Sequence, residues 1–170
     1  FNDHLATSEA GLYNAFSTLQ GANVTDLVID IRYNGGGYPG IASEGGYMVA
    51  GAAAKGKKTF ELTQFNSKHA TIDPGTGHAI TPTPFHTLSL GFSAALLPAN
   101  QPLPTLNLPR VFVLTGPDTC SASEAIINGL SGAGVQVIQI GSTTCGKPYG
   151  FYPADNCSTT YFSIQFRGVN

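Results

Sequence analysis

Three short runs of apolar residues, each followed at once by a loop of small and polar residues, constrain the fold of this chain most. The runs lie at 26–32 (DLVIDIR), 110–115 (RVFVLT) and 135–140 (VQVIQI). The first run is typical of a strand that is buried on both faces of a sheet, the second predicts another buried strand, and the third predicts a further strand. Between them, the residue pattern predicts helices at 8–20, at 41–54 and from Ser121 to about Leu130. Strands that alternate with helices predict an α/β fold with a central, largely parallel sheet flanked by helices.

Residues 55–101 lack a regular pattern. They are polar and rich in Pro, Thr and His, and we expect short strands and a long excursion there, because loops of this length in compact domains are usually functional or mobile. Alternating apolar residues at 160–166 predict a fourth strand. Residues 1–170 are expected to form one domain. Because the first residue is Phe1 and the last expected strand simply stops, we expect this chain to be a fragment of a longer protein.

Charge and hydropathy exclude several classes of function. Charged residues make up 11% of the chain, the formal net charge is −2, and Lys and Arg do not cluster, so the basic surface of a nucleic-acid-binding protein is missing. No apolar run approaches the roughly 18 residues of a membrane-spanning helix. Abundant small polar residues and few lysines favour a secreted or periplasmic protein. The sequence does not indicate an oligomeric state.

The ends of the three apolar runs carry residues suited to acyl transfer. Parallel strands end at one edge of the sheet, where α/β proteins form their sites. Ser121 opens a helix after the second run, which exposes its hydroxyl and favours developing negative charge. A serine needs a base, and Lys147 after the third run is the candidate, provided that burial or positive potential lowers its pKa. The amide of Ala122 and one from Gly36 or Gly37 are candidates for an oxyanion hole.

Each of these residues also has a structural interpretation. Ser121 with Glu124 three positions later fits a helix capping box, Lys147 fits an ordinary surface lysine, and the glycine run at 35–37 fits a turn. His4 is the reserve candidate for the base. The other histidines, His69, His78 and His86, lie in the polar excursion without the spacing of a zinc site. A serine with a lysine base needs no metal and no organic cofactor, and we expect neither.

Together, three segments resemble a known family. DLVIDIRYNGGG at 26–37, VFVLT at 111–115 followed by SASE at 121–124, and IGSTTCGK at 140–147 are similar, in this order, to the motifs of the tail-specific, C-terminal processing serine proteases. The resemblance covers about 1–166, except for 55–101. It implies a ClpP/crotonase-like core and endopeptidase action on protein or peptide substrates.

Carried onto this chain, the resemblance implies a Ser/Lys dyad. Ser121 would be the acyl-forming nucleophile and Lys147 its general base, 26 positions later. The amides of Ala122 and of the Gly36–Gly37 turn would form the oxyanion hole.

The chain departs from the family pattern in two places. Phe151 stands where many members carry a glutamine that orients the lysine, and Phe151 cannot hydrogen-bond. No PDZ domain, which usually precedes the core, is visible. The alternative function is therefore a catalytically inactive relative that binds peptides or hydrophobic ligands. An enzyme acting on acyl-CoA with the same type of core is a third interpretation, which the Ser/Lys pair disfavours.

The three cysteines, Cys120, Cys145 and Cys157, allow at most one internal disulfide. Cys145 and Cys157 flank an expected hairpin around 153–156, and we favour this pair. Cys120 and Cys145 precede the proposed nucleophile and base, and they would also come close if the Ser/Lys dyad assembles.

Overall fold

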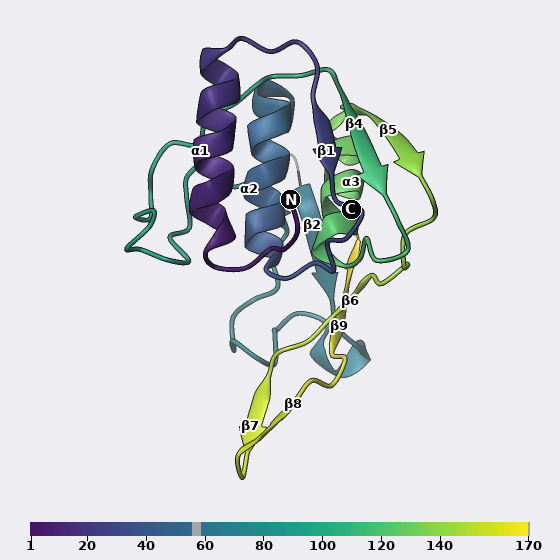
Figure 1. Ribbon diagram of the computed structural model, residues 1–170. Helices are drawn as coiled ribbons and strands as arrows, with labels where there is room; N and C mark the ends of the chain where they lie inside the picture. The colour runs from purple at the N-terminus through teal and green to yellow at the C-terminus, as the bar shows by residue number, and fades with distance from the viewer. Residues whose placement is uncertain (56–58, 170) are drawn as a thin grey trace.

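The three apolar runs form a parallel sheet in the computed structural model, which describes residues 1–55 and 59–169. Strands β1 (Val28–Asp30), β4 (Arg110–Thr115) and β5 (Gln136–Gly141) lie in the order β1-β4-β5 (Figure 1). Their register is continuous, because Phe112 of β4 pairs with Val28 on one side and with Ile138 on the other. The predicted parallel sheet is confirmed, and all three strands end at the same edge.

In the described part of the chain, three α-helices pack beside these strands. They are α1 (Ser8–Gly21), α2 (Pro39–Ala50), which continues into the 3₁₀ helix η1 (Gly51–Ala54), and α3 (Ala122–Ala133). Helix α2 contacts both α1 and α3, and α3 contacts β5; Figure 1 shows α1 and α2 side by side. All three helices lie where the sequence predicts them. No helix within the described ranges is long and apolar enough to cross a membrane.

A second, antiparallel sheet was not predicted from the sequence. It contains β3 (Thr83–Pro84), β2 (Thr59–Gln64), β9 (Phe166–Val169) and β6 (Tyr149–Gly150), in the order β3-β2-β9-β6. Strands β2 and β3 and the 3₁₀ helix η2 (Ser67–His69) lie in the excursion expected at 55–101. The hairpin of β7 (Ala154–Asn156) and β8 (Thr159–Tyr161) extends away from the helices (Figure 1).

The strand expected at 160–166 is wrong as one element. Strand β8 ends at Tyr161 and β9 begins at Phe166, with no strand between them. The alternation is misleading here because Phe162 and Ile164 are 58% and 63% exposed and cover no core. Apolar alternation predicts a strand only where one of its faces is buried.

The core lies between the helices and one face of the parallel sheet. On β4, Val111 and Val113 are fully buried, whereas Phe112 and Leu114 on the opposite face are half-buried. The expectation that the first run is buried on both faces is wrong, since β1 is an edge strand and Val28 is 60% exposed. Other buried apolar side chains come from α2, β2 and α3: Ile41, Met48, Val49, Phe60, Ile126 and Leu130.

Candidate active site

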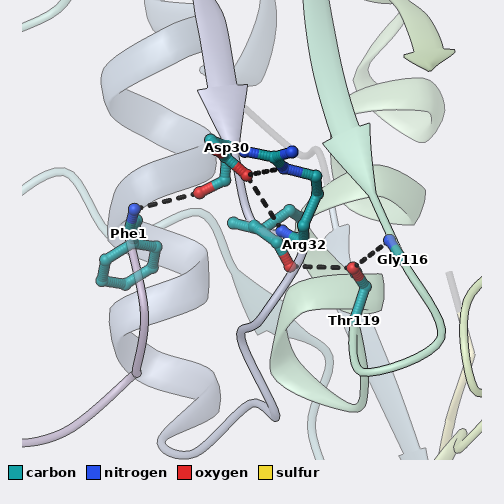
Figure 2. A network of polar contacts seen from close by, with 6 residues as sticks. Phe1, Asp30, Arg32, Gly116 and Thr119 are labelled. Atoms are coloured by element: carbon teal, nitrogen blue, oxygen red, sulfur yellow. Dashed lines mark hydrogen bonds and ion pairs between the residues drawn. The ribbon is translucent and has the colours of Figure 1, made fainter. Parts of the chain in front are cut away.

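The loop between β4 and α3 is held against the end of β1 by one threonine. The buried hydroxyl of Thr119 accepts a hydrogen bond from the Gly116 amide at 2.9 Å and donates to the Ile31 carbonyl at 2.8 Å. Figure 2 shows this network beside the ion pair between Asp30, the last residue of β1, and Arg32. These contacts fix the path of the chain just before Ser121.

Ser121 lies on a strained turn between this loop and α3. Its backbone angles are φ +58° and ψ −117°, a region that costs a non-glycine residue about 1–3 kcal/mol and is concentrated at functional sites. A serine on a sharp strand-to-helix turn is the arrangement that exposes the nucleophile in α/β hydrolases. The position at the start of a twelve-residue helix adds the positive end of the helix dipole.

The glycine turn after β1 packs directly against Ser121. A Cβ atom added to Gly36 would lie 2.8 Å from both the Cys120 carbonyl oxygen and Ser121 Cβ, and 3.0 Å from the Ala122 nitrogen. The φ angles of Gly36 and Gly37, +101° and +131°, also require glycine. The structure therefore brings Gly36 into contact with Ser121 and Ala122, while Gly37, the next residue, packs against His4.

The backbone amides of Ala122 and of the glycine turn were predicted to form the oxyanion hole. Within the described ranges, the amides of Ala122 and Gly37 donate no hydrogen bond to the protein. The Gly36 amide, by contrast, donates to Asn34 Oδ1 at 2.9 Å. Of the two glycine amides considered from the sequence, Gly37 is thus the one available to a ligand.

Asn34 holds the glycine turn, the N-terminal segment and the nucleophile loop together, a role that sequence reasoning missed. Its side chain is fully buried, and Nδ2 donates to the Phe1 carbonyl at 3.2 Å. Its backbone carbonyl accepts hydrogen bonds from the Cys120 amide at 3.1 Å and the Ser123 hydroxyl at 2.9 Å. The short sequence Asn-Gly-Gly-Gly signals the turn but not these distant partners.

His4 lies on the same network rather than on the serine. Its Nδ1 atom is 3.0 Å from Asn34 Oδ1, and its backbone pairs with the glycine turn. Burial lowers the pKa of His4 to about 4, against hydrogen bonds that raise it, so the ring is neutral at pH 7. Its Nε2 atom is buried without a hydrogen bond. His4, the reserve candidate, therefore does not hydrogen-bond to Ser121 in this arrangement.

Glu124 joins the nucleophile turn to the loop that carries Lys147. One carboxylate oxygen accepts from the Ser121 amide at 2.8 Å and the Lys147 amide at 2.9 Å. The other accepts from the Thr144 hydroxyl at 2.7 Å and the Gly146 amide at 2.8 Å. Burial acts to raise the pKa of Glu124, but these four donors hold it below the usual value. The capping box in the sequence predicted the hydrogen bond between Glu124 and the Ser121 amide, but not those with the loop at 144–147.

The Lys147 ammonium group rests on an aromatic ring. Nζ lies 5.1 Å from the centroid of Phe151. Across the described ranges, Nζ forms no hydrogen bond and so is not joined to Ser121 Oγ. The backbone of Lys147 is fixed beside Ser121 through Glu124, while its side chain is directed to Phe151.

The expected Cys145–Cys157 disulfide is wrong. Cys120 and Cys145 are joined, with Cα atoms 5.3 Å apart, and Cys157 is an exposed free thiol. The alternative pairing forms because parallel β4 and β5 bring their following loops together, and the Cys145 amide donates to the Thr119 carbonyl at 3.0 Å. Cys157 instead lies in the projecting turn of the β7–β8 hairpin.

The same cysteines bear on metal binding. Among the residues that the structure describes, Cys120, Glu124 and Cys145 form the one group of potential ligands close enough to share an ion. The two sulfur atoms are bonded to each other, so neither is a thiolate ligand while the disulfide is intact.

Comparison with known proteins places this arrangement in a family. The family model of peptidase family S41 matches residues 1–150. No curated protein sequence matches the chain significantly.

Solved structures share the fold at low sequence identity. A protein from Bacteroides fragilis NCTC 9343, described as an S41 protease, superposes with a TM-score of 0.77 over 100% of this chain, at 24% identity. The photosystem II D1 C-terminal processing protease has a TM-score of 0.61 over 98%, at 18% identity. A lipoprotein from Streptococcus agalactiae has a TM-score of 0.58 over 99%, at 15% identity. The chain spans 41%, 36% and 52% of these three proteins.

Proposed function

Because this chain belongs to peptidase family S41, we propose that it is a serine endopeptidase of the C-terminal processing type, acting through an acyl-enzyme. The observation that carries the proposal is the contact between the strained Ser121 turn and the Gly36 backbone. Among the described residues, the amides of Ala122 and of Gly37, which follows Gly36 in the chain, donate no hydrogen bond. Preorganised amides next to a nucleophile are the requirement for stabilising a tetrahedral oxyanion.

In the proposed reaction, Ser121 Oγ attacks the carbonyl carbon of the scissile peptide bond while Lys147 Nζ accepts the hydroxyl proton. The amides of Ala122 and Gly37 stabilise the negative charge on the carbonyl oxygen. Lys147 then donates the proton to the leaving amine, which departs and leaves an ester on Ser121. Water, deprotonated by Lys147, hydrolyses this ester and restores the serine.

Formation of the dyad requires a movement of the lysine side chain. Nζ must leave the face of the Phe151 ring, where it lies at 5.1 Å from the centroid, and turn towards Ser121. The backbone need not move, since the Lys147 amide already shares a carboxylate oxygen with the Ser121 amide. Catalytic hydrogen bonds often tighten only when substrate binds.

The proposed substrates are proteins or peptides, cleaved in the periplasm or outside the cell. The disulfide beside the site supports an oxidising compartment. A structural neighbour described as a lipoprotein is consistent with such a location.

Labelling with a fluorophosphonate tests the proposal. Intact mass should show one adduct on the wild type and none on Ser121→Ala or Lys147→Ala. Ser131→Ala is the matched control, because it removes an exposed hydroxyl from the same helix and should leave labelling intact. Labelling that survives in Ser121→Ala would overturn the assignment of the nucleophile.

A peptide-binding module without catalysis is the second candidate. This function is favoured by the position of Lys147 Nζ, which lies over the ring of Phe151 and, among the described residues, forms no hydrogen bond with Ser121 Oγ. Peptide binding measured by calorimetry, with no fluorophosphonate adduct on the wild type, would establish this function in place of the peptidase.

A further inference from the structure

His4 is a buried histidine that the proposed reaction does not use. It lies in the segment before α1 and is fully buried. Burial lowers the pKa of its ring to about 4, so at pH 7 the ring is neutral and carries a proton on only one of its nitrogens. The hydrogen bonds of the two nitrogens decide which of them carries this proton.

The contacts of Asn34 assign the proton to Nδ1 of His4. Asn34 Nδ2 donates to the Phe1 carbonyl at 3.2 Å, and Asn34 Oδ1 accepts from the Gly36 amide at 2.9 Å. These two partners orient the side-chain amide, so that Oδ1 is the atom that lies 3.0 Å from His4 Nδ1. Because Oδ1 only accepts, Nδ1 is the donor. Asn34 Oδ1 thus receives one hydrogen bond from the glycine turn and one from the ring.

The other ring nitrogen, Nε2, keeps a buried lone pair. Among the described residues, Nε2 forms no hydrogen bond. A buried acceptor without a donor costs free energy of folding, and such a group in a native structure calls for an explanation. An apolar side chain of similar size would avoid this cost. What the imidazole of His4 contributes at this place is therefore the donor at Nδ1.

The backbone of His4 holds the same turn. The His4 amide donates to the Gly36 carbonyl, and the Tyr38 amide donates to the His4 carbonyl, each at 2.9 Å. Gly37 lies between these two hydrogen bonds, and a Cβ atom added to it would overlap with the His4 carbonyl. The Gly37 amide, which donates no hydrogen bond within the described ranges, is thus flanked by residues that His4 holds.

We propose that His4 is a positioning residue for the oxyanion hole: its Nδ1–H group, acting through Asn34 Oδ1, fixes the glycine turn that carries the Gly37 amide. The inference rests on the proposed function. Donors that stabilise an oxyanion must be in place before the charge develops, and the Gly37 amide has no hydrogen bond of its own in the described chain to hold it. His4 neither touches the substrate nor transfers a proton.

Two amide variants distinguish the ring nitrogens of His4. The side-chain nitrogen of His4→Asn is as many bonds from the backbone as Nδ1, and that of His4→Gln is as many bonds away as Nε2. We expect His4→Gln to lower kcat for a peptide about tenfold with KM unchanged, because the oxyanion donor loses its fixed position. His4→Asn, which keeps a donor near Asn34, should restore the wild-type kcat. Unfolding curves give the folded fraction of each variant, so that kcat is compared per folded molecule.

NMR of the ring nitrogens in isotopically labelled wild type tests the same inference without a substitution. At pH 7, Nδ1 of His4 should carry the proton and Nε2 should not. A proton on Nε2 would overturn the inference, whether or not the variants fold.

His69→Gln is the matched control. It changes an exposed histidine in η2 and should leave kcat unchanged. Wild-type kcat in His4→Gln, or an equal loss in His4→Asn and His4→Gln, would overturn this inference and leave the peptidase intact, provided that Ser121→Ala is inactive. A wild type that neither hydrolyses peptides nor forms a fluorophosphonate adduct would overturn the proposed function, and this inference with it.

Discussion

The disulfide between Cys120 and Cys145 ties the residue directly before Ser121 to the loop that reaches Lys147 two positions later. It closes a loop of 25 positions in sequence separation. A bridge of this length contributes about 3 kcal/mol to the free energy of unfolding, mostly by restricting the unfolded chain. Here it also fixes the two loops of the site relative to each other.

Thiol counting tests this pairing. Iodoacetamide should modify the native, unreduced protein once, at the exposed Cys157, and the reduced, unfolded protein three times. Reduction should lower fluorophosphonate labelling of Ser121 and destabilise the fold by about 3 kcal/mol. Cys157→Ser is the control: without reduction, this variant should keep the wild-type labelling of Ser121 and the wild-type free energy of unfolding. A peptide map that links Cys145 to Cys157 would refute the pairing.

Glu124→Gln should weaken the hydrogen bonds that join the Ser121 turn to the loop at 144–147. The carboxylate accepts hydrogen bonds from four donors, whereas an amide has one acceptor oxygen and would direct its own NH₂ group at two of them. We expect labelling of Ser121 to fall about tenfold and the free energy of unfolding to fall by about 1–3 kcal/mol. Glu61→Gln is the control: it changes a carboxylate of β2 that accepts none of these four hydrogen bonds, and it should leave labelling unchanged.

The pH dependence of this effect has a definite sign. Because hydrogen bonds hold the pKa of Glu124 below its ordinary value, its contribution to stability is present above the unfolded-state pKa and is lost as the pH falls through the folded-state pKa. The stability difference between wild type and Glu124→Gln should therefore shrink on acidification below about pH 4.5. A difference that stays constant down to pH 2.5 would show that the charge of Glu124 does not hold the loops.

The parallel sheet and the approximate site could be predicted because both depend on local patterns. Apolar runs mark the strands, and parallel pairing brings the ends of all such strands to one edge. The glycine turn, Ser121 and Lys147 lie in the loops that follow the three runs, so the approach of these loops could be predicted without knowledge of side-chain contacts.

Contacts between distant side chains could not be predicted in the same way. Nothing adjacent to Asn34 in sequence signals that its carbonyl accepts the Ser123 hydroxyl. The hydrogen bonds from Glu124 to the loop at 144–147 depend on how far β5 extends beside β4. The same pairing of the two strands decides that Cys145 bonds to Cys120 and not to Cys157. The antiparallel sheet was missed because β3 and β6 contain two residues each, too few to show a period.

Gly36→Ala should inactivate the site. The new methyl group would lie 2.8 Å from the Cys120 carbonyl and from Ser121 Cβ, and the φ angle of +101° disfavours alanine. We expect loss of fluorophosphonate labelling of at least a hundredfold, which corresponds to about 3 kcal/mol. Gly35→Ala is the matched control, since a Cβ there meets nothing within 4 Å. Equal labelling of the two variants would contradict the close approach of the glycine turn to Ser121.

Glu44→Gln should alter the pH dependence of stability, because Glu44 and Glu9 are buried together between α2 and α1. Both hold the loop that follows β3: Glu44 accepts the Leu90 amide at 2.7 Å, and Glu9 accepts the Gly91 and Phe92 amides, each at 2.8 Å. Burial, with the neighbouring Glu9 carboxylate, raises the pKa of Glu44 to about 8 against the opposing Leu90 hydrogen bond.

A carboxyl group whose pKa is raised on folding stabilises the protein fully below its unfolded-state pKa, and this stabilisation is lost as the pH rises through the folded-state pKa. Between pH 5 and 8, the free energy of unfolding of wild type relative to Glu44→Gln should therefore fall, by up to about 1.4 kcal/mol per pH unit. Denaturant unfolding at several pH values measures this, with Asp118→Asn, an exposed carboxylate, as the control. A wild-type curve parallel to that of Glu44→Gln would mean that Glu44 is already ionised at pH 5, and that the Leu90 amide and surrounding dipoles compensate its buried charge.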